Sequence, residues 1–193
     1  SADHQVKTGA SFCRGDETCE FLFEDQFYEG WGWTWQVKRA DFDKHLFDIA
    51  TSRGLDIRLE CEVQEVSNSS KIQEVVYTQN NESHKLTGRF ILDASGYGRV
   101  LPRLLNLESQ SDLPNRNAVF THISDVNRTI KHGENIFVHS FNDNKDWIWV
   151  IPFNDNTASV GVVGSPETTE ALVTESDFLH FFQGFEDLNN RFV

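Results

Sequence analysis

The sequence predicts an α+β fold in which a large, mostly antiparallel sheet carries a few helices. Apolar and polar residues alternate through most of the chain, which is the two-residue period of a half-buried strand. Polar turn segments separate these runs at hairpin spacing, and a helical period is clear in only a few places. With 193 residues, 38% of them hydrophobic and 24% charged, the chain can bury a substantial core.

The first part of the chain alternates and then changes period. Strands are expected at 5–13, 20–23 and 33–38. From residue 40 the apolar side chains recur at three- and four-residue spacing, and Gly54 can end that run as a C-cap. We therefore expect a helix at 40–53.

A meander of three strands is expected after the helix. The strands are predicted at 57–66, 72–78 and 83–86. Asn and Ser at 68–70 and the pair Asn80 and Asn81 are typical of the tight turns that join such strands.

A continuous apolar run at 90–92 predicts a strand buried on both faces. It leads through Asp93 and Gly96 into a short amphipathic turn at 101–105.

The second half of the chain returns to strands and ends in helices. We predict strands at 118–124, 135–141, 147–153 and 158–163, and helices at 168–172 and 176–184. The turn 154–156 joins the last two strands as a hairpin, and Ser176 is the expected N-cap of the last helix. The polar stretch 108–117 is the expected seam between a part at 1–107 and a part at 108–193.

Composition excludes several classes of function. A net charge of −13 repels phosphate backbones, so nucleic acid is not an expected partner. No apolar run approaches the roughly 20 residues that span a bilayer, and no basic-then-apolar signal opens the chain, so no membrane is expected either. The three cysteines suit neither a metal-ligand set nor an even disulfide framework. We expect a cytoplasmic protein with reduced thiols and no metal.

The hexapeptide 147–152 reads W-x-W-x-I-P. Its defining residues are Trp147, Trp149, Ile151 and Pro152. In a strand, two indoles two residues apart lie on the same face. The hexapeptide resembles the signature of flavin-dependent halogenases, where it lies in the tunnel between flavin and substrate and keeps the two apart. The alternative is a hydrophobic strand whose tryptophans fill a core and which ends at Pro152.

Three further stretches resemble the same family in order and spacing. Residues 6–12 place Lys7 in a K-x-G-x-x-F stretch, similar to the one that holds the essential lysine of halogenases acting on phenols and pyrroles. Residues 35–43 resemble the V-x-R-x-x-F-D segment that opens a helix in this family and in aromatic hydroxylases. Residues 91–96 resemble the segment that returns the chain to the FAD domain. The resemblance covers nearly the whole chain and implies a hydroxylase-like FAD/NAD(P)-binding fold, with part of the FAD domain in 1–107 and the substrate-binding sheet in 108–193.

Lys7 is the candidate catalytic residue. Its primary amine stands on a flexible stem, and the pKa of a lysine falls readily on burial. By resemblance, such a lysine meets hypohalous acid made at the flavin and either binds it or forms a haloamine. The alternative is a solvated lysine at a strand edge.

Arg39, Asp93 and Gly96 are the candidate cofactor-binding residues. Arg39 stands at a helix start, where a cation is disfavoured by the dipole, and a guanidinium there can hold a phosphate in forked geometry. Asp93 follows an apolar run, and Gly96 allows a backbone to approach a phosphate closely. The alternatives are a surface pair between Arg39 and Asp43, and a turn in which Asp93 is only a cap.

The tryptophans of the hexapeptide have no group for acid–base chemistry, so their expected role is steric. Trp31, Trp33 and Trp35 form a second aromatic patch, for which packing in the core is the expected use. The seven histidines show no ligand spacing: His4, His45, His84, His122, His132, His139 and His180. Among them we expect His45 to be exposed, and His122 and His139 to have structural roles rather than to face a substrate cavity.

The glycine-rich G-x-G-x-x-G fingerprint that binds the ADP part of FAD does not occur. The chain also contains no methionine, so it looks processed or excised from something longer. We expect these 193 residues alone to bind FAD poorly and to be inactive, because most pyrophosphate donors are missing.

The resemblance implies an FAD-dependent halogenase. A separate flavin reductase supplies reduced FAD, oxygen and chloride or bromide yield hypohalous acid, and a small electron-rich aromatic, a phenol or a pyrrole, takes the halogen. One alternative is an FAD monooxygenase or dehydrogenase of the same superfamily that does not halogenate. A second alternative is a non-catalytic sheet domain that binds a small molecule.

Overall fold

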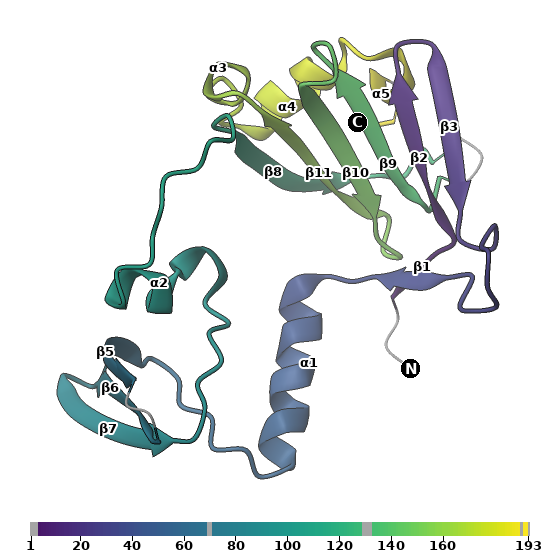
Figure 1. The fold of residues 1–193 in the computed structure, drawn as a ribbon. Helices are drawn as coiled ribbons and strands as arrows, with labels where there is room; N and C mark the ends of the chain where they lie inside the picture. The colour runs from purple at the N-terminus through teal and green to yellow at the C-terminus, as the bar shows by residue number, and fades with distance from the viewer. Residues whose placement is uncertain (1–3, 69–70, 129–132, 190, 193) are drawn as a thin grey trace. The chain divides into compact units, whose positions relative to one another are not determined.

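A six-stranded sheet is the main feature of the computed structural model, which describes residues 4–68, 71–128, 133–189 and 191–192 (Figure 1). The chain divides into two units: residues 1–46 with 114–193, and residues 47–113. The sequence predicted a different kind of division, in which 1–107 contributes to FAD binding and 108–193 to substrate binding. This functional division stays a prediction.

The sheet of the first unit is antiparallel at every junction but one. Its strands are β2 (Gly9–Arg14), β3 (Glu17–Leu22), β8 (Asn117–Ser124), β9 (Ile136–Phe141), β10 (Asp146–Pro152) and β11 (Thr157–Gly164). They lie in the order β3-β2-β9-β10-β11-β8, and only β2 and β9 run parallel. The four strands predicted in the second half are confirmed within two residues at each end.

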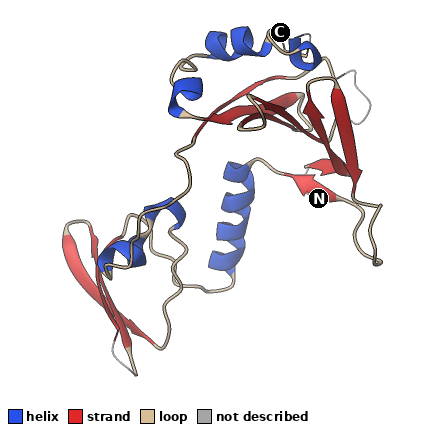
Figure 2. Ribbon diagram, turned by 45° about the horizontal axis from the view of Figure 1, so that its top comes forward, coloured by secondary structure: helices blue, strands red, loops and turns tan. Residues whose placement is uncertain are grey.

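Three helices cover one face of this sheet (Figure 2). They are α3 (Pro166–Thr169), α4 (Glu175–Phe182) and α5 (Glu186–Asn189). The core lies between these helices and the sheet. Ile148 and Val150 of β10 are fully buried there, in one cluster with the buried Phe178 and Phe182 of α4. Burial of each such side chain contributes roughly 1.5–3 kcal/mol. Trp147, Trp149 and Ile151 of β10 alternate with these buried residues and point to the opposite face of the sheet.

The N-cap predicted for α4 is wrong by two residues. Thr174 is the cap: its Oγ1 accepts a hydrogen bond from the N–H of Asp177, whose carboxylate accepts one from the N–H of Thr174. This reciprocal capping box satisfies two otherwise free donors, which Ser176 inside the first turn cannot do. The helix α5 was not predicted at all.

The predicted strand 5–13 is broken at Thr8. β1 (Gln5–Lys7) pairs with β4 (Thr34–Gln36) in a separate two-stranded sheet. The buried Asn135 holds the break, because its Oδ1 accepts hydrogen bonds from the backbone N–H groups of Thr8 and Gly9 at 2.8 and 3.0 Å. These two donors are therefore not available to one continuous strand ladder.

The predicted helix 40–53 is confirmed as α1 (Arg39–Ser52). Gly54 follows it with φ of +80°, a left-handed conformation that glycine adopts at low cost. Among the described residues, no helix is both long and apolar enough to cross a bilayer.

The second unit contains the expected meander. β5 (Glu62–Asn68), β6 (Gln73–Gln79) and β7 (Glu82–Gly88) lie in sequence order with β6 in the middle. The turn between the last two strands is confirmed, since Asn80 and Asn81 both have positive φ, at 52° and 65°. This is the conformation that tight hairpin turns require.

The predicted strand 90–92 is wrong. Phe90 and Leu92 are 78% and 85% exposed, and none of the described residues pairs with this segment. Burial on both faces requires neighbouring strands and a layer on each side, and the second unit places neither around the segment. The chain instead continues through a 3-10 turn (Gly96–Gly98) into α2 (Val100–Leu104), close to the predicted turn 101–105.

Candidate functional site

Trp147, Trp149 and Ile151 share one face of β10, as the period of two predicted, and it is the face that the helices leave open. All three side chains are half-buried, and none belongs to the core. The alternative in which the two tryptophans fill a core is therefore wrong. Pro152 is buried and ends the strand.

An apolar row crosses this open face. Strand register places Trp149 between Gly161 of β11 and Val138 of β9, and the row continues to Phe120 of β8 and Phe12 of β2. Phe120 is 63% exposed and Phe12 is 46% exposed. The hexapeptide thus stands in the middle of an apolar surface that spans five strands.

The indole of Trp149 lies directly against the backbone of Gly161. A Cβ built at Gly161 would come within 2.2 Å of Cζ2 of the indole, closer than any real contact. The indole Nε1 donates a hydrogen bond to Ser159 Oγ at 3.3 Å, and the ring centroid lies 6.2 Å from that of Phe120. Glycine at 161 is therefore the residue that lets the indole lie flat on the sheet.

We expect Gly161→Ala to displace the indole of Trp149 and to lower the free energy of unfolding by roughly 1–3 kcal/mol, the usual cost of overpacking. Tryptophan fluorescence and urea denaturation measure the two effects. Gly30→Ala is the matched control, because there the nearest atom to a new Cβ is the flexible end of Gln26 at 3.2 Å. Unchanged fluorescence in Gly161→Ala would contradict the packing.

Lys7 ends β1 and is half-buried. Its Nζ lies 5.1 Å from the ring centroid of Phe23, and no carboxylate pairs with it among the described residues. Burial lowers the pKa of Lys7 below its ordinary value. The two residues after Lys7, Thr8 and Gly9, donate their backbone N–H groups to Asn135. These hydrogen bonds hold the backbone next to Lys7 in place.

The ring of Phe23 also lines an aromatic cavity of about 530 Å³. The cavity is lined by Phe21, Phe23, Asp25, Gln26, Phe27, Tyr28 and Trp31. A volume of this size holds a small aromatic molecule.

Gln36 is a buried residue that the sequence did not single out. It is 5% exposed, and its Nε2 donates hydrogen bonds to the carbonyls of Glu134 and Pro152 at 3.0 and 2.6 Å. It thereby ties β4 to the end of the hexapeptide. The available signal was a lone amide between Trp35 and Val37 in an apolar stretch.

The other amide atom of Gln36, Oε1, is buried without a hydrogen-bond partner among the described residues. Gln36 lines a cavity of about 400 Å³. The remaining lining residues are His4, Lys38, Asp41, His45, Phe153, Asn154 and Asp155. A buried acceptor without a partner costs about 1–3 kcal/mol, and a ligand with an N–H or O–H donor would remove that cost.

Lys38 and Asp155 form an ion pair at this cavity. The hydrogen bond from Lys38, together with one from Thr157, lowers the pKa of Asp155 to about 2. Asp155 follows β10 directly after Phe153 and Asn154, so the pair joins the end of the hexapeptide strand to the residue before α1.

The Asp155 pair predicts a specific dependence of stability on pH. A carboxylate with a depressed pKa in the folded state stabilises the fold fully above its unfolded value of 3.8, and this is lost as pH falls towards about 2. We expect Asp155→Asn to be less stable than the parent at pH 5 and the difference to shrink between pH 4 and 2. Urea denaturation across this range measures it. A difference that stays constant down to pH 2 would exclude this ionisation as the cause.

Asp125 follows β8 and holds two arginines near the same end of the sheet. It is fully buried and receives hydrogen bonds from Arg191 at 2.8 and 2.9 Å and from Arg128 at 2.8 Å. Arg128 also donates to the carbonyls of Phe153 and Thr157, which flank the hairpin after the hexapeptide. This buried cluster fixes where the hexapeptide strand ends.

The three candidate cofactor residues lie at exposed positions. Arg39 pairs with Asp43 through Nε and Nη2, with N–O distances of 2.9 to 3.1 Å. Asp93 accepts hydrogen bonds from the N–H groups of Ser95 and Leu101 and so acts as a cap. The Ser95 side chain, followed by these two N–H groups, lowers the pKa of Asp93. Gly96 has φ of +55°, and no atom lies within 4 Å of a Cβ built there.

The patch of Trp31, Trp33 and Trp35 is not part of the core, contrary to the prediction. The three rings pack edge to face at 5.3 and 4.9 Å, and they are 78%, 36% and 53% exposed. β4 pairs only with β1 among the described strands, so its outer side is left uncovered.

The histidines differ in their exposure to solvent. His45 is exposed as expected, and exposed His122 packs its ring 5.4 Å from that of Phe153. His139 is buried on the helix side of the sheet, where its Nδ1 lies 2.8 Å from Asp187, so it does not face the tryptophan side. His132 lies outside the described residues.

A family model described as tryptophan halogenase matches residues 17–193. The chain belongs to the tryptophan halogenase family. Three predictions from the sequence are thereby confirmed. They are the membership of the family, the α+β fold class of an FAD-dependent oxidoreductase, and FAD as the family's cofactor.

Three relatives illustrate the family. A flavoprotein/dehydrogenase of Cytophaga hutchinsonii is 39% identical with a TM-score of 0.86, over 97% of this chain and 47% of its own. CmlS, a flavin-dependent halogenase, is 26% identical with a TM-score of 0.75, over 96% of this chain and 34% of its own. The 1H-pyrrole-2-carbonyl-[peptidyl-carrier protein] chlorinase of Pseudomonas fluorescens is 26% identical over 183 residues, which are 90% of this chain and 41% of the relative. The chain thus spans about a third to a half of the length of these three relatives.

The residues present fit part of the family's cofactor. The buried Oε1 of Gln36 is an acceptor without a partner among the described residues, as a donor such as the imide N–H of a flavin would require, and the cavity that Gln36 lines has the volume of one ring system. A volume of about 400 Å³ is too small for a whole FAD, which agrees with the absence of the glycine-rich fingerprint from the sequence.

Proposed function

We propose that the complete gene product carrying this chain is an FAD-dependent halogenase of a small electron-rich aromatic. The observation that carries the proposal is Lys7, a half-buried amine with a lowered pKa and no carboxylate partner among the described residues. An amine kept free of counter-ions and partly out of water is available as a nucleophile at lower pH than an ordinary lysine.

Lys7 would carry the halogen. FAD, when bound and reduced, would activate oxygen, and oxygen is the oxidant that converts halide into hypohalous acid. The Nζ lone pair of Lys7 attacks the halogen, the N–halogen bond forms as the halogen–oxygen bond breaks, and a nitrogen proton leaves with the hydroxide as water. The aromatic ring then takes the halogen from nitrogen and loses a ring proton, which restores the amine.

The open face of the sheet would separate flavin from substrate. Trp147 and Trp149 stand half-buried in an apolar row with no group that exchanges protons, so they close space without taking part in chemistry. The aromatic cavity bordered by Phe23 is the proposed substrate site, because its rings can stack on a phenol or pyrrole close to Lys7. The P. fluorescens relative, named for a pyrrole substrate, supports this class.

Two sets of residues are proposed to hold the flavin. Gln36 and Lys38 line the cavity that fits a ring of the cofactor. Arg39, Asp93 and Gly96 are the proposed contacts to the phosphates and ribose, as the resemblance implies. For Arg39 this requires the guanidinium to leave Asp43, which is inexpensive because exposed ion pairs contribute at most about 1 kcal/mol.

Other partners follow from the chemistry. Chloride or bromide is the second substrate, and a separate flavin reductase supplies the reduced cofactor. We place the protein in the cytoplasm, where its free cysteines would remain reduced.

The test is a product assay on the complete gene product. It is supplied with FAD, a flavin reductase, oxygen, bromide and a panel of phenols and pyrroles, and products are analysed by mass spectrometry. A product with the bromine isotope doublet is the expected result. Products that gain only oxygen, or oxidised substrate without bromine, would overturn the halogenase proposal.

A second candidate is a flavin monooxygenase or dehydrogenase that does not halogenate. The observation that favours it is the 39% identity to the C. hutchinsonii flavoprotein/dehydrogenase. In that case W-x-W-x-I-P is inherited structure, and substrate oxidation would proceed equally well without halide.

A further inference from the structure

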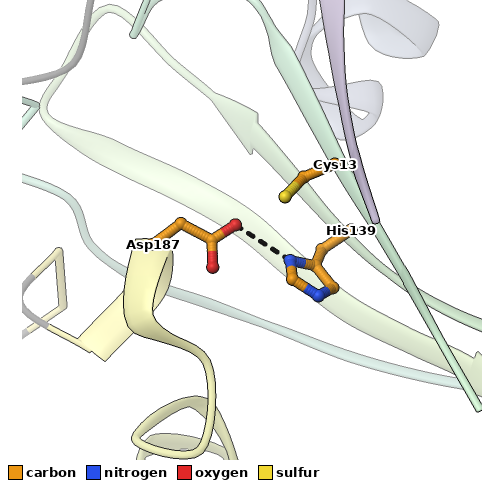
Figure 3. Close-up of side chains that lie close together, drawn as sticks. All are labelled: Cys13, His139 and Asp187. Atoms are coloured by element: carbon orange, nitrogen blue, oxygen red, sulfur yellow. Dashed lines mark hydrogen bonds and ion pairs between the residues drawn. The ribbon is translucent and has the colours of Figure 1, made fainter. Parts of the chain in front are cut away.

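Cys13, His139 and Asp187 lie close together (Figure 3). Strand alternation places Cys13 and His139 on the helix side of the large sheet, opposite to Trp149. Cys13 of β2 and His139 of β9 are direct neighbours in the parallel register, so their side chains leave the sheet on the same side. Asp187 reaches them from α5. One ligand atom from each residue lies within 4.8 Å of the others.

The cluster is shielded from organic substrates but reachable for an ion. Cys13 and His139 are 8% and 7% exposed, whereas the Asp187 side chain is 29% exposed. The His139 ring is held by Phe185, whose centroid lies 4.9 Å away at an edge-to-face angle. Its Nδ1 lies 2.8 Å from Asp187 Oδ2 and therefore points towards the carboxylate. The imidazole is thus oriented before any ion arrives.

The donor set has the chemistry of a zinc site. It offers one sulfur, one imidazole nitrogen and one carboxylate oxygen, a mixture that suits Zn²⁺, whereas Ca²⁺ and Mg²⁺ prefer oxygen alone. Tetrahedral zinc with bonds of about 2.0–2.3 Å separates its ligand atoms by roughly 3.3–3.7 Å. The three atoms all lie within 4.8 Å of one another, and the Nδ1 to Oδ2 distance of 2.8 Å must open by less than about 1 Å.

We propose that Cys13, His139 and Asp187 form a binding site for a single Zn²⁺ ion, with water as the fourth ligand. Binding releases the thiol proton of Cys13 to solvent and requires the tautomer of His139 that is protonated at Nε2. The ion joins the N-terminal strand β2 and the inner strand β9 to the C-terminal helix α5. Its role is structural, because the site lies on the opposite side of the sheet from Trp149.

The competing explanation is a metal-free cluster in which Asp187 accepts a hydrogen bond from His139. Burial and the neighbouring Asp187 raise the pKa of the Cys13 thiol, so without a metal the sulfur keeps its proton. Both states use the same three residues, and only direct metal binding separates them.

The test uses Co²⁺ as a spectroscopic substitute for Zn²⁺, titrated into the metal-free chain. We expect one equivalent to produce thiolate-to-cobalt charge-transfer absorption and the intense visible bands of tetrahedral cobalt, and one equivalent of Zn²⁺ to abolish both. Zn²⁺ is also expected to raise the melting temperature. This readout needs neither FAD nor activity, so its failure would not bear on the halogenase proposal.

Variants assign the ligands. Cys13→Ser should remove the charge-transfer band, and Cys19→Ser is the matched control, because Cys19 is an exposed cysteine of the neighbouring strand β3 and should leave the spectrum unchanged. Asp187→Asn tests the site without altering the sheet and should weaken Co²⁺ binding at least about tenfold. Absence of a charge-transfer band in the parent chain, an equal band in Cys13→Ser, or an unchanged Co²⁺ affinity in Asp187→Asn would overturn the proposal.

Discussion

Replacing Lys7 with alanine is expected to abolish halogenation by the complete gene product. We expect the bromination rate to fall by roughly 10²–10⁴-fold, the range for loss of a positioned group that transfers protons or forms bonds in the transition state. The physical reason is that no other amine is placed as Lys7 is, half-buried over Phe23 and without a carboxylate partner in the described part of the chain. Rates of brominated product, read by mass spectrometry, measure the effect.

Two further variants decide what Lys7 does. Lys7→Arg keeps the positive charge but cannot supply a neutral amine, so it should be as inactive as the alanine variant. Lys85→Ala is the matched control, since Lys85 is exposed and paired with Glu74 in the meander, and it should retain full activity. A Lys7→Arg enzyme with normal bromination would show that the charge alone acts, and a fully active Lys7→Ala would remove Lys7 from the mechanism.

Replacing Asp125 with alanine is expected to cost about 3–5 kcal/mol of the free energy of unfolding. The substitution leaves Arg191 in the protein interior without its carboxylate and Arg128 without its ion pair, because both donate to the fully buried Asp125. Urea denaturation followed by tryptophan fluorescence measures the cost. All five tryptophans lie in the unit that contains Asp125, so the signal reports on the correct part of the chain.

Glu17→Ala is the matched control for Asp125. Glu17 also pairs with an arginine, Arg14, but the two side chains are 73% and 61% exposed. Exposed pairs contribute at most about 1 kcal/mol, so this variant should unfold almost as the parent does. Equal losses in the two variants would mean that the buried cluster does not carry the stability assigned to it.

Local pattern was sufficient for much of this fold. The period of two located β8 to β11 and placed Trp147 and Trp149 on one face, because side-chain direction in a strand depends only on position along it. The change of period located α1, and the glycine after it marked its end. Three of the errors share one cause: the break at Thr8, the loop at 90–92 and the exposed patch of Trp31 depend on what lies beside each segment, which a local pattern does not contain.

The sequence marked candidate residues for the site but not the environment in which they lie. The order and spacing of the motifs sufficed to place the chain in its family and to mark Lys7 and the hexapeptide. Which face of β10 stays open was decided by α3, α4 and α5 covering the other one. The desolvation of Lys7 and the hydrogen bond from Gln36 to the carbonyl of Pro152 are likewise products of the folded structure, since the latter joins residues 116 positions apart.

Periodicity and motif order are local properties of the chain, so the sequence was enough to locate most of the elements, to place the chain in its family and to mark the residues proposed to carry the chemistry. Tertiary structure alone decided which side chains lose water and which meet. Cys13, His139 and Asp187 show the difference most clearly, since no ligand spacing in the sequence predicts them and only parallel pairing of β2 with β9, covered by α5, brings sulfur, nitrogen and oxygen together.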